Sequence, residues 1–103
     1  MNWIPIQLPT IWPSNNILLI ELEGKKICIS QLENSFYAYT DLCPHAGVSL
    51  SDGGSLVKEC IIVCPLHNYK FNVKTGRNVS GEDYKLRTYP IRKIDDQTLE
   101  INI

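Results

Sequence analysis

The sequence predicts a small all-β protein, either a sandwich or a barrel. Apolar and polar residues alternate with a period of two through much of the chain, which is typical of half-buried strands. Turn-forming residues separate these segments, and no long segment keeps the three-and-four spacing of an amphipathic helix. At 103 residues the chain has the length of one domain with a modest core. We therefore expect a single domain, residues 1–103, built from antiparallel strands.

The elements can be placed in order along the chain. The first thirteen residues contain Pro5, Pro9 and Pro13, and proline cannot donate a hydrogen bond within a central strand, so an edge strand and a loop are expected there. Alternation or a strand-like run then predicts strands around Ile27 and Ile29, at Ser35–Thr40, at Leu56–Val63 and at Leu99–Ile103. The turns between strands are expected at Glu23-Gly24, Glu33-Asn34-Ser35, Asp52-Gly53-Gly54, Lys74-Thr75-Gly76 and Asp95-Asp96.

Charge and hydropathy argue against two classes of partner. The net charge is −1 and no dense run of Lys and Arg is present, so a nucleic-acid partner is not expected. The longest apolar run, Ile17–Ile20, is far too short to span a membrane, and the N-terminus lacks the layout of a secretory signal. A cytoplasmic protein without a membrane partner is therefore expected.

Both histidines of the chain stand just beyond a Cys-Pro pair. The first segment is Cys43-Pro44-His45 and the second is Cys64-Pro65-Leu66-His67. Thiolate and imidazole are the usual ligands of zinc, iron and iron–sulfur centres, and a short spacing lets one loop present two donors to one site. Each segment follows a strand-like run, and two loops at strand ends can approach each other. The spacing predicts a metal site at Cys43, His45, Cys64 and His67, and no catalytic residue is predicted.

Three kinds of site are compatible with these residue types. A structural zinc site accepts two cysteines and two histidines, but its usual order is a close pair of cysteines followed by a close pair of histidines. A nucleophile with a histidine base is conceivable for Cys64 and His67, but it leaves the other Cys/His pair without a purpose. A two-iron cluster with two thiolates on one iron and two imidazoles on the other suits a mixed pair in each loop. We expect the cluster, with a zinc-stapled interaction module as the alternative of another class.

The two segments resemble the cluster-binding loops of Rieske-type [2Fe–2S] ferredoxins. This family includes the ferredoxins of ring-hydroxylating dioxygenases and the small subunits of assimilatory nitrite reductases. Three further segments occur in a family-like order, at Ser49–Gly53, Lys70–Gly76 and Tyr89–Arg92. The resemblance implies a Rieske-like (ISP-type) antiparallel β-sandwich or barrel with two cluster-binding loops.

The resemblance also implies a set of ligands and a role. Cys43 and Cys64 would bind the inner iron, and His45 and His67 the outer iron, of one [2Fe–2S] cluster per chain. The protein would be a one-electron carrier rather than an enzyme, with a reductase as electron donor and an oxygenase or other reductase subunit as acceptor. It would be a monomer when free. The small subunit of an NAD(P)H nitrite reductase stays as the alternative function.

Departures from the high-potential members of the family predict a low reduction potential. Those members carry a disulfide between the two loops, at positions that are Val48 and Leu66 here. They also place Ser and Tyr hydroxyls against the cluster sulfurs, where this chain has Tyr69 and Phe71. Hydrogen bonds to the sulfurs stabilise the reduced cluster, so their absence lowers the potential. We expect a value near the low end of the Rieske range of roughly −150 to +300 mV.

Two cysteines lie outside the motif. Cys28 stands between Ile27 and Ile29, and Cys60 stands beside Ile61. Both are predicted to be small buried apolar residues, and no disulfide is expected between them.

Overall fold

The computed structural model describes residues 2–44, 47–57, 60–66, 68–79, 81 and 84–103. In these ranges the regular structure consists of strands, all paired antiparallel, which confirms the all-β prediction. The strands are β1 (Trp3–Gln7), β2 (Leu18–Leu22), β3 (Lys25–Leu32), β4 (Ser35–Thr40), β5 (Ser55–Val57), β6 (Ile61–Val63), β7 (Lys70–Asn72), β8 (Thr88–Tyr89), β9 (Ile91–Asp95) and β10 (Thr98–Asn102).

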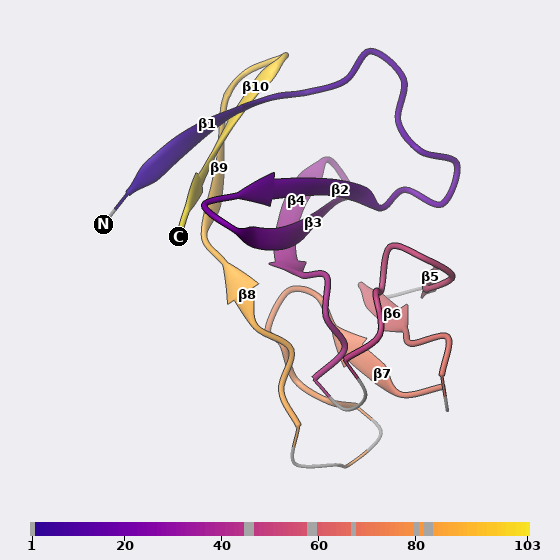
Figure 1. Cartoon of the computed structure of the whole chain (residues 1–103). Helices are drawn as coiled ribbons and strands as arrows, with labels where there is room; N and C mark the ends of the chain where they lie inside the picture. The colour runs from indigo at the N-terminus through magenta and orange to yellow at the C-terminus, as the bar shows by residue number, and fades with distance from the viewer. Residues whose placement is uncertain (1, 45–46, 58–59, 67, 80, 82–83) are drawn as a thin grey trace.

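The strands form three sheets. The outer sheet has the order β1-β10-β9, the central sheet β2-β3-β4-β8, and the loop sheet β5-β6-β7. Figure 1 shows the central sheet between the outer sheet at the top and the loop sheet at the bottom. The two Cys-Pro segments lie on the side of the loop sheet, since the first follows β4 and the second follows β6.

The central sheet is covered on both faces. Ile27 and Ile29 of β3 pack into a core that includes Leu99 and Ile101 of the outer sheet. Cys28, between them, points to the opposite face and joins a second core that contains both motif cysteines, Cys43 and Cys64. The buried position of Cys28 agrees with its prediction, but the half-buried pattern expected for this strand fails at Ser30, because a second layer replaces solvent on that face. The second core connects this sheet directly to the site.

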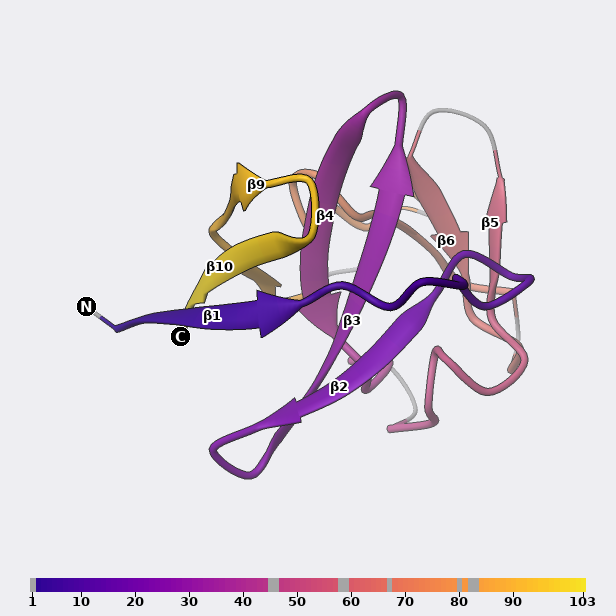
Figure 2. The ribbon, with the colours of Figure 1, turned by 90° about the horizontal axis from the view of Figure 1, so that it is seen from above.

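The N-terminal strand lies at the edge of the outer sheet, as its prolines predict. Pro5 is opposite Glu100 of β10, and β1 has β10 as its single neighbour in the sheet. Figure 2 shows β1 and β10 side by side, with both chain termini at the same end of the molecule. The strands β9 and β10, which follow the second Cys-Pro segment in the sequence, therefore complete the sheet that contains β1.

One predicted strand is two strands in the structure. The run Leu56–Val63 was expected to be continuous, but it contains the end of β5 and all of β6, which pair as a hairpin with Leu56 opposite Ile62. Cys60 has a φ of 62°, in the left-handed region that a continuous strand excludes. This reversal places Cys64 at the end of β6, beside β7.

Candidate metal centre

The first Cys-Pro segment forms a closed loop at the end of the central sheet. A β-bridge between Leu42 and Ser49 joins the two ends of the loop. Inside this bridge, the Cys43 N–H donates to the Val48 carbonyl (2.9 Å), and the Gly47 N–H donates to the Cys43 carbonyl (2.7 Å). Gly47 has a φ of 70°, which glycine adopts without the cost that a Cβ atom brings. The loop is thus held by its own backbone.

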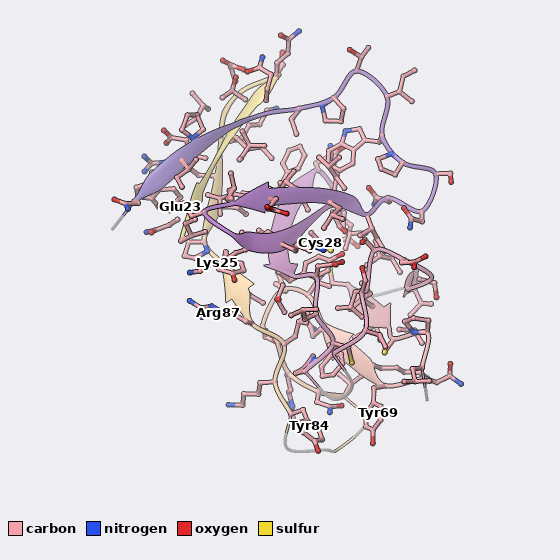
Figure 3. The ribbon with its side chains drawn as sticks, viewed as in Figure 1. Glu23, Lys25, Cys28, Tyr69, Tyr84 and Arg87 are labelled. Atoms are coloured by element: carbon pink, nitrogen blue, oxygen red, sulfur yellow. The ribbon has the colours of Figure 1, made fainter. Side chains whose placement is uncertain are left out.

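The second Cys-Pro segment closes in the same way. The Cys64 N–H donates to the carbonyl of Tyr69, five residues on, just as Cys43 donates to Val48. Asn68 turns the chain with a φ of 57°, a conformation that asparagine tolerates better than most residues. Figure 3 places Tyr69 at the lower end of the molecule, with the loop sheet. Two loops of equivalent backbone design therefore carry the two cysteines.

The structure brings the two motif cysteines together. Cys43 is 1% exposed and Cys64 is 0% exposed, and neither is in a disulfide. Burial raises the pKa of the Cys64 thiol. A hydrogen bond from the Leu66 N–H to the sulfur acts in the opposite direction, whereas the neighbouring Cys43 side chain raises this pKa further. The two sulfur atoms are thus direct neighbours in a water-excluded position, with a backbone N–H aimed at one of them.

The remaining predicted ligands, His45 and His67, lie outside the described residues. Within the described part of the chain, no group of three or more His, Cys, Asp or Glu side chains could hold a metal ion. The cysteine pair would therefore need further ligands, and the sequence positions of the two histidines, two and three residues beyond the cysteines, suit that need.

The donor chemistry of the cysteine pair fits an iron–sulfur centre. Two adjacent thiolates on separate loops can bind one iron, and backbone N–H groups that point at the sulfurs stabilise negative charge there. The Leu66 N–H is such a donor, because it hydrogen-bonds the Cys64 sulfur. Pro44 and Pro65, directly after the cysteines, fix one backbone dihedral in each loop and so reduce its freedom before binding.

The other two cysteines do not join the pair. Cys28 is fully buried, as predicted, and its thiol donates a hydrogen bond to the Asp41 carboxylate (3.2 Å). Cys60 is only partly buried, against the edge of the second core, which corrects the prediction that it is buried. It lies in the turn just before β6, with a left-handed backbone, and so outside the regular inward-facing positions of the hairpin. Both are free thiols, so the expected absence of a disulfide between them agrees with the structure.

Asp41 is a buried residue near the site that the sequence reasoning did not single out. It lies two residues before Cys43, is 1% exposed, and accepts hydrogen bonds from Ser49 and Ser51 beyond the first loop. The signal that could have found it is an acidic residue between a strand and a ligand loop. One such residue is weak evidence without the structure, because acidic residues are common at strand ends.

Two closed loops that each bring a buried cysteine to the same core, on an all-β scaffold, are the arrangement that a small metal-cluster protein needs. Residues 2–90 match the protein family described as Rieske [2Fe-2S] domain. The chain belongs to this family. In the described residues, no helix is both long enough and apolar enough to cross a membrane.

Several relatives of this chain are named as ferredoxin components or subunits. It is 35% identical, over 92 residues, to the ferredoxin component of a naphthalene 1,2-dioxygenase system from Pseudomonas aeruginosa, covering 88% of this chain and 86% of the relative. Its fold is similar to the ferredoxin of carbazole 1,9a-dioxygenase from Nocardioides aromaticivorans IC177, with a TM-score of 0.78, 25% identity, and coverage of 94% of this chain and 95% of the other.

A second structural neighbour shows the same fold within a complex. One chain of a complex of reduced oxygenase and oxidised ferredoxin in carbazole 1,9a-dioxygenase matches with a TM-score of 0.79 and 23% identity. The match covers 96% of this chain and 100% of that chain. The Rieske-like antiparallel architecture expected from the two Cys-Pro segments is therefore confirmed.

Proposed function

We propose that this chain is a one-electron carrier that holds one Rieske [2Fe–2S] cluster and passes electrons from a reductase to a terminal oxygenase. Cys43 and Cys64 bind one iron, and His45 and His67 bind the other. When bound, the cluster supplies reversible one-electron chemistry. The chain works as a component of a multicomponent oxidoreductase and not as an enzyme by itself. Residues 1–103 form the single domain, which acts in the cytoplasm and is a monomer when free.

The observation that carries the proposal is the contact between Cys43 and Cys64. The two cysteines are buried in one core, at equivalent positions of two loops closed by the same backbone hydrogen bond. A carrier needs its cluster held in a fixed geometry with little rearrangement when the charge changes. Loops tied by their own backbone, and sulfurs shielded from water, meet that need.

An accessible loop tip supports transfer to a partner. Leu66 lies between the two predicted ligands of the second loop, and its side chain is 41% exposed. Leu42, directly before Cys43, is 52% exposed. Exposed apolar side chains beside a buried centre are typical of surfaces that contact other proteins. The names of the relatives described above support an oxygenase as the partner that accepts the electron.

The first test is the metal and acid-labile sulfide content of protein purified without oxygen. We expect two irons and two sulfides per chain, and a rhombic EPR signal that appears on reduction with dithionite. One zinc and no sulfide would show instead that the four residues staple the fold, and would remove the electron-carrier proposal. An obligate tight complex with a large partner on purification would favour the nitrite reductase subunit over the free carrier.

Variants of the cysteines test the ligand set directly. Cys43→Ser and Cys64→Ser are each expected to lose most of the iron and sulfide, because both remove a thiolate from the same metal. Cys60→Ser is the matched control, since this partly buried cysteine lies outside the pair and should leave the content unchanged. His45→Ala and His67→Ala should each also lower the content. Retention of two irons and two sulfides in either motif-cysteine variant would contradict the assigned ligands.

A further inference from the structure

Asp41 is a buried acidic residue close to the first loop. Its side chain is 1% exposed, and it follows the last residue of β4. Cys43 is two residues further on, so their Cα atoms are at most about 7 Å apart. In the described part of the chain, the two ion pairs are Arg92 with Glu100 and Lys93 with Asp96. Asp41 is in neither pair, so no described cation neutralises its charge.

Neutral groups satisfy the carboxylate of Asp41. The Ser49 hydroxyl donates to Oδ2 (2.6 Å), while the Ser51 N–H (2.8 Å) and the Cys28 thiol (3.2 Å) donate to Oδ1. Both carboxylate oxygens therefore accept hydrogen bonds from neutral donors, and within the described residues dipoles rather than a counter-ion stabilise the group.

The same residue ties down the return of the first loop. The Leu50 N–H donates to the Asp41 carbonyl (2.6 Å), in addition to the side-chain bonds from Ser49 and Ser51. Through Cys28, the carboxylate is also connected to β3 in the centre of the molecule, and Figure 3 shows Cys28 on that strand. Asp41 therefore connects β3 of the central sheet and the end of β4 to the segment Ser49–Ser51, which follows the first loop.

We propose that Asp41 is a positioning residue that fixes the first loop and whose buried negative charge lowers the affinity of the centre at Cys43 for an electron. The inference rests on the proposed function, since it concerns the group that Cys43 would hold. Adding an electron makes that group more negative, and a buried negative charge nearby opposes this change. The opposition is strong where water is excluded, because the interior screens charge much less than water does.

The test is the reduction potential of Asp41→Asn. Asparagine has nearly the same shape and can still accept the bonds from Ser51 and Cys28, but it carries no charge. We expect the equilibrium constant for one-electron reduction to rise between about threefold and tenfold, which is roughly 28–59 mV at 59 mV per tenfold change. The EPR spectrum of the reduced variant should stay that of the wild type, which shows that the ligand geometry is kept.

Ser49→Ala is the matched control. It removes a hydrogen bond within the same network but leaves the Asp41 charge in place, so the equilibrium constant should change less than twofold. An unchanged potential in Asp41→Asn would overturn the inference. Equal shifts in Asp41→Asn and Ser49→Ala would also overturn it, because they would show that loop geometry, and not charge, sets the effect.

Two further measurements keep the outcomes distinct. If Asp41→Asn fails to fold, the reduction potential of Asp41→Ser is measured instead. In addition, redox-difference infrared spectra are recorded for wild-type protein labelled with ¹³C-aspartate. A labelled carboxylate band that shifts on reduction is expected, and its absence would overturn the inference. Iron and sulfide are measured in every sample: wild-type protein without two irons would defeat the proposed function, whereas loaded variants with unchanged potentials would defeat only the role of Asp41.

Discussion

At the scale of single residues, Gly76 occupies a position that only glycine fits. Its φ is 80°, and a Cβ atom there would overlap the carbonyl oxygen of Leu86. The Leu86 N–H donates to the Gly76 carbonyl (2.8 Å), so the two backbones are held at this close approach. Gly76 thereby fixes the segment after β7 against the chain that leads to β8.

We expect Gly76→Ala to lower the free energy of unfolding by about 3 kcal/mol. Left-handed backbone costs a residue with a Cβ atom about 1–2 kcal/mol, and displacing the packed Leu86 segment adds about 1–2 kcal/mol. Urea unfolding of the cluster-loaded protein, followed by visible absorbance and circular dichroism, measures the loss. Gly24→Ala is the control, because Gly24 has a φ of 78° with open space around it and should lose only the backbone term. Equal losses in the two variants would contradict the close approach.

Some residues of the site can be predicted from the sequence and others cannot, for a physical reason. Cys43 and Cys64 belong to short motifs, so their spacing alone indicates ligands, and the structure brings the two together. Asp41 belongs to no motif, because its partners Cys28, Ser49 and Ser51 are brought to it by the fold. A role that depends on tertiary contacts leaves no local pattern to read.

At the scale of elements, hairpin turns are predicted well, and strand boundaries less well. The expected turns at Glu23-Gly24 and Glu33-Asn34 both have positive φ angles at their two central residues, as tight hairpins require. The division of Leu56–Val63 into two strands was missed, because the left-handed conformation of Cys60 leaves no trace in an apolar sequence. Burial of the second face of β3 was predicted at Cys28 but missed at Ser30, which is fully buried, since it depends on which sheets stack.

The β2–β3 turn can be improved by one substitution. Glu23 has a φ of 49°, which is costly for glutamate and is much better tolerated by asparagine. Glu23→Asn creates the Asn-Gly pair that this turn type prefers, and we expect it to raise the free energy of unfolding by about 0.5–1 kcal/mol. The midpoint of urea unfolding measures this gain. Glu21→Asn in the regular part of β2 is the control and should be neutral or destabilising; an equal gain there would show that loss of a negative charge is responsible.

At the scale of the whole molecule, the residues of the two Cys-Pro loops predict a low reduction potential. Val48 and Leu66 stand where high-potential members are expected to have a disulfide, and Phe71 is fully buried and has no hydroxyl to donate. Since hydrogen bonds to the sulfurs favour the reduced state, we expect a midpoint near the low end of the range of about −150 to +300 mV. A potentiometric titration followed by visible spectroscopy measures it. A midpoint above about +150 mV would contradict this prediction.

The core beside the site also couples stability to alkaline pH. Burial raises the pKa of the Cys28 thiol, and its hydrogen bond to Asp41 and the charge of Asp41 raise it further. Burial likewise raises the pKa of the Tyr39 hydroxyl, although the hydrogen bond with Ser30 acts in the opposite direction. Both groups therefore stay protonated in the folded protein at a pH where the same groups ionise in the unfolded chain. Their contribution to stability is complete below the unfolded pKa and is lost as the pH rises above it.

Cys28→Ala tests this coupling. Cysteine titrates near pH 8.5 in an unfolded chain, so above that pH the wild type should lose up to about 1.4 kcal/mol of unfolding free energy per pH unit through Cys28. The variant should be less stable at pH 7, because it lacks the buried sulfur and its hydrogen bond, but its apparent melting temperature should fall less between pH 8.5 and 10. Tyr39→Phe is the control: it removes a group that ionises only near pH 10 in the unfolded chain, so it should keep the wild-type slope over the same interval. If Cys28→Ala kept that slope too, the thiol would be ionising equally in both states, and burial beside Asp41 would not govern its protonation.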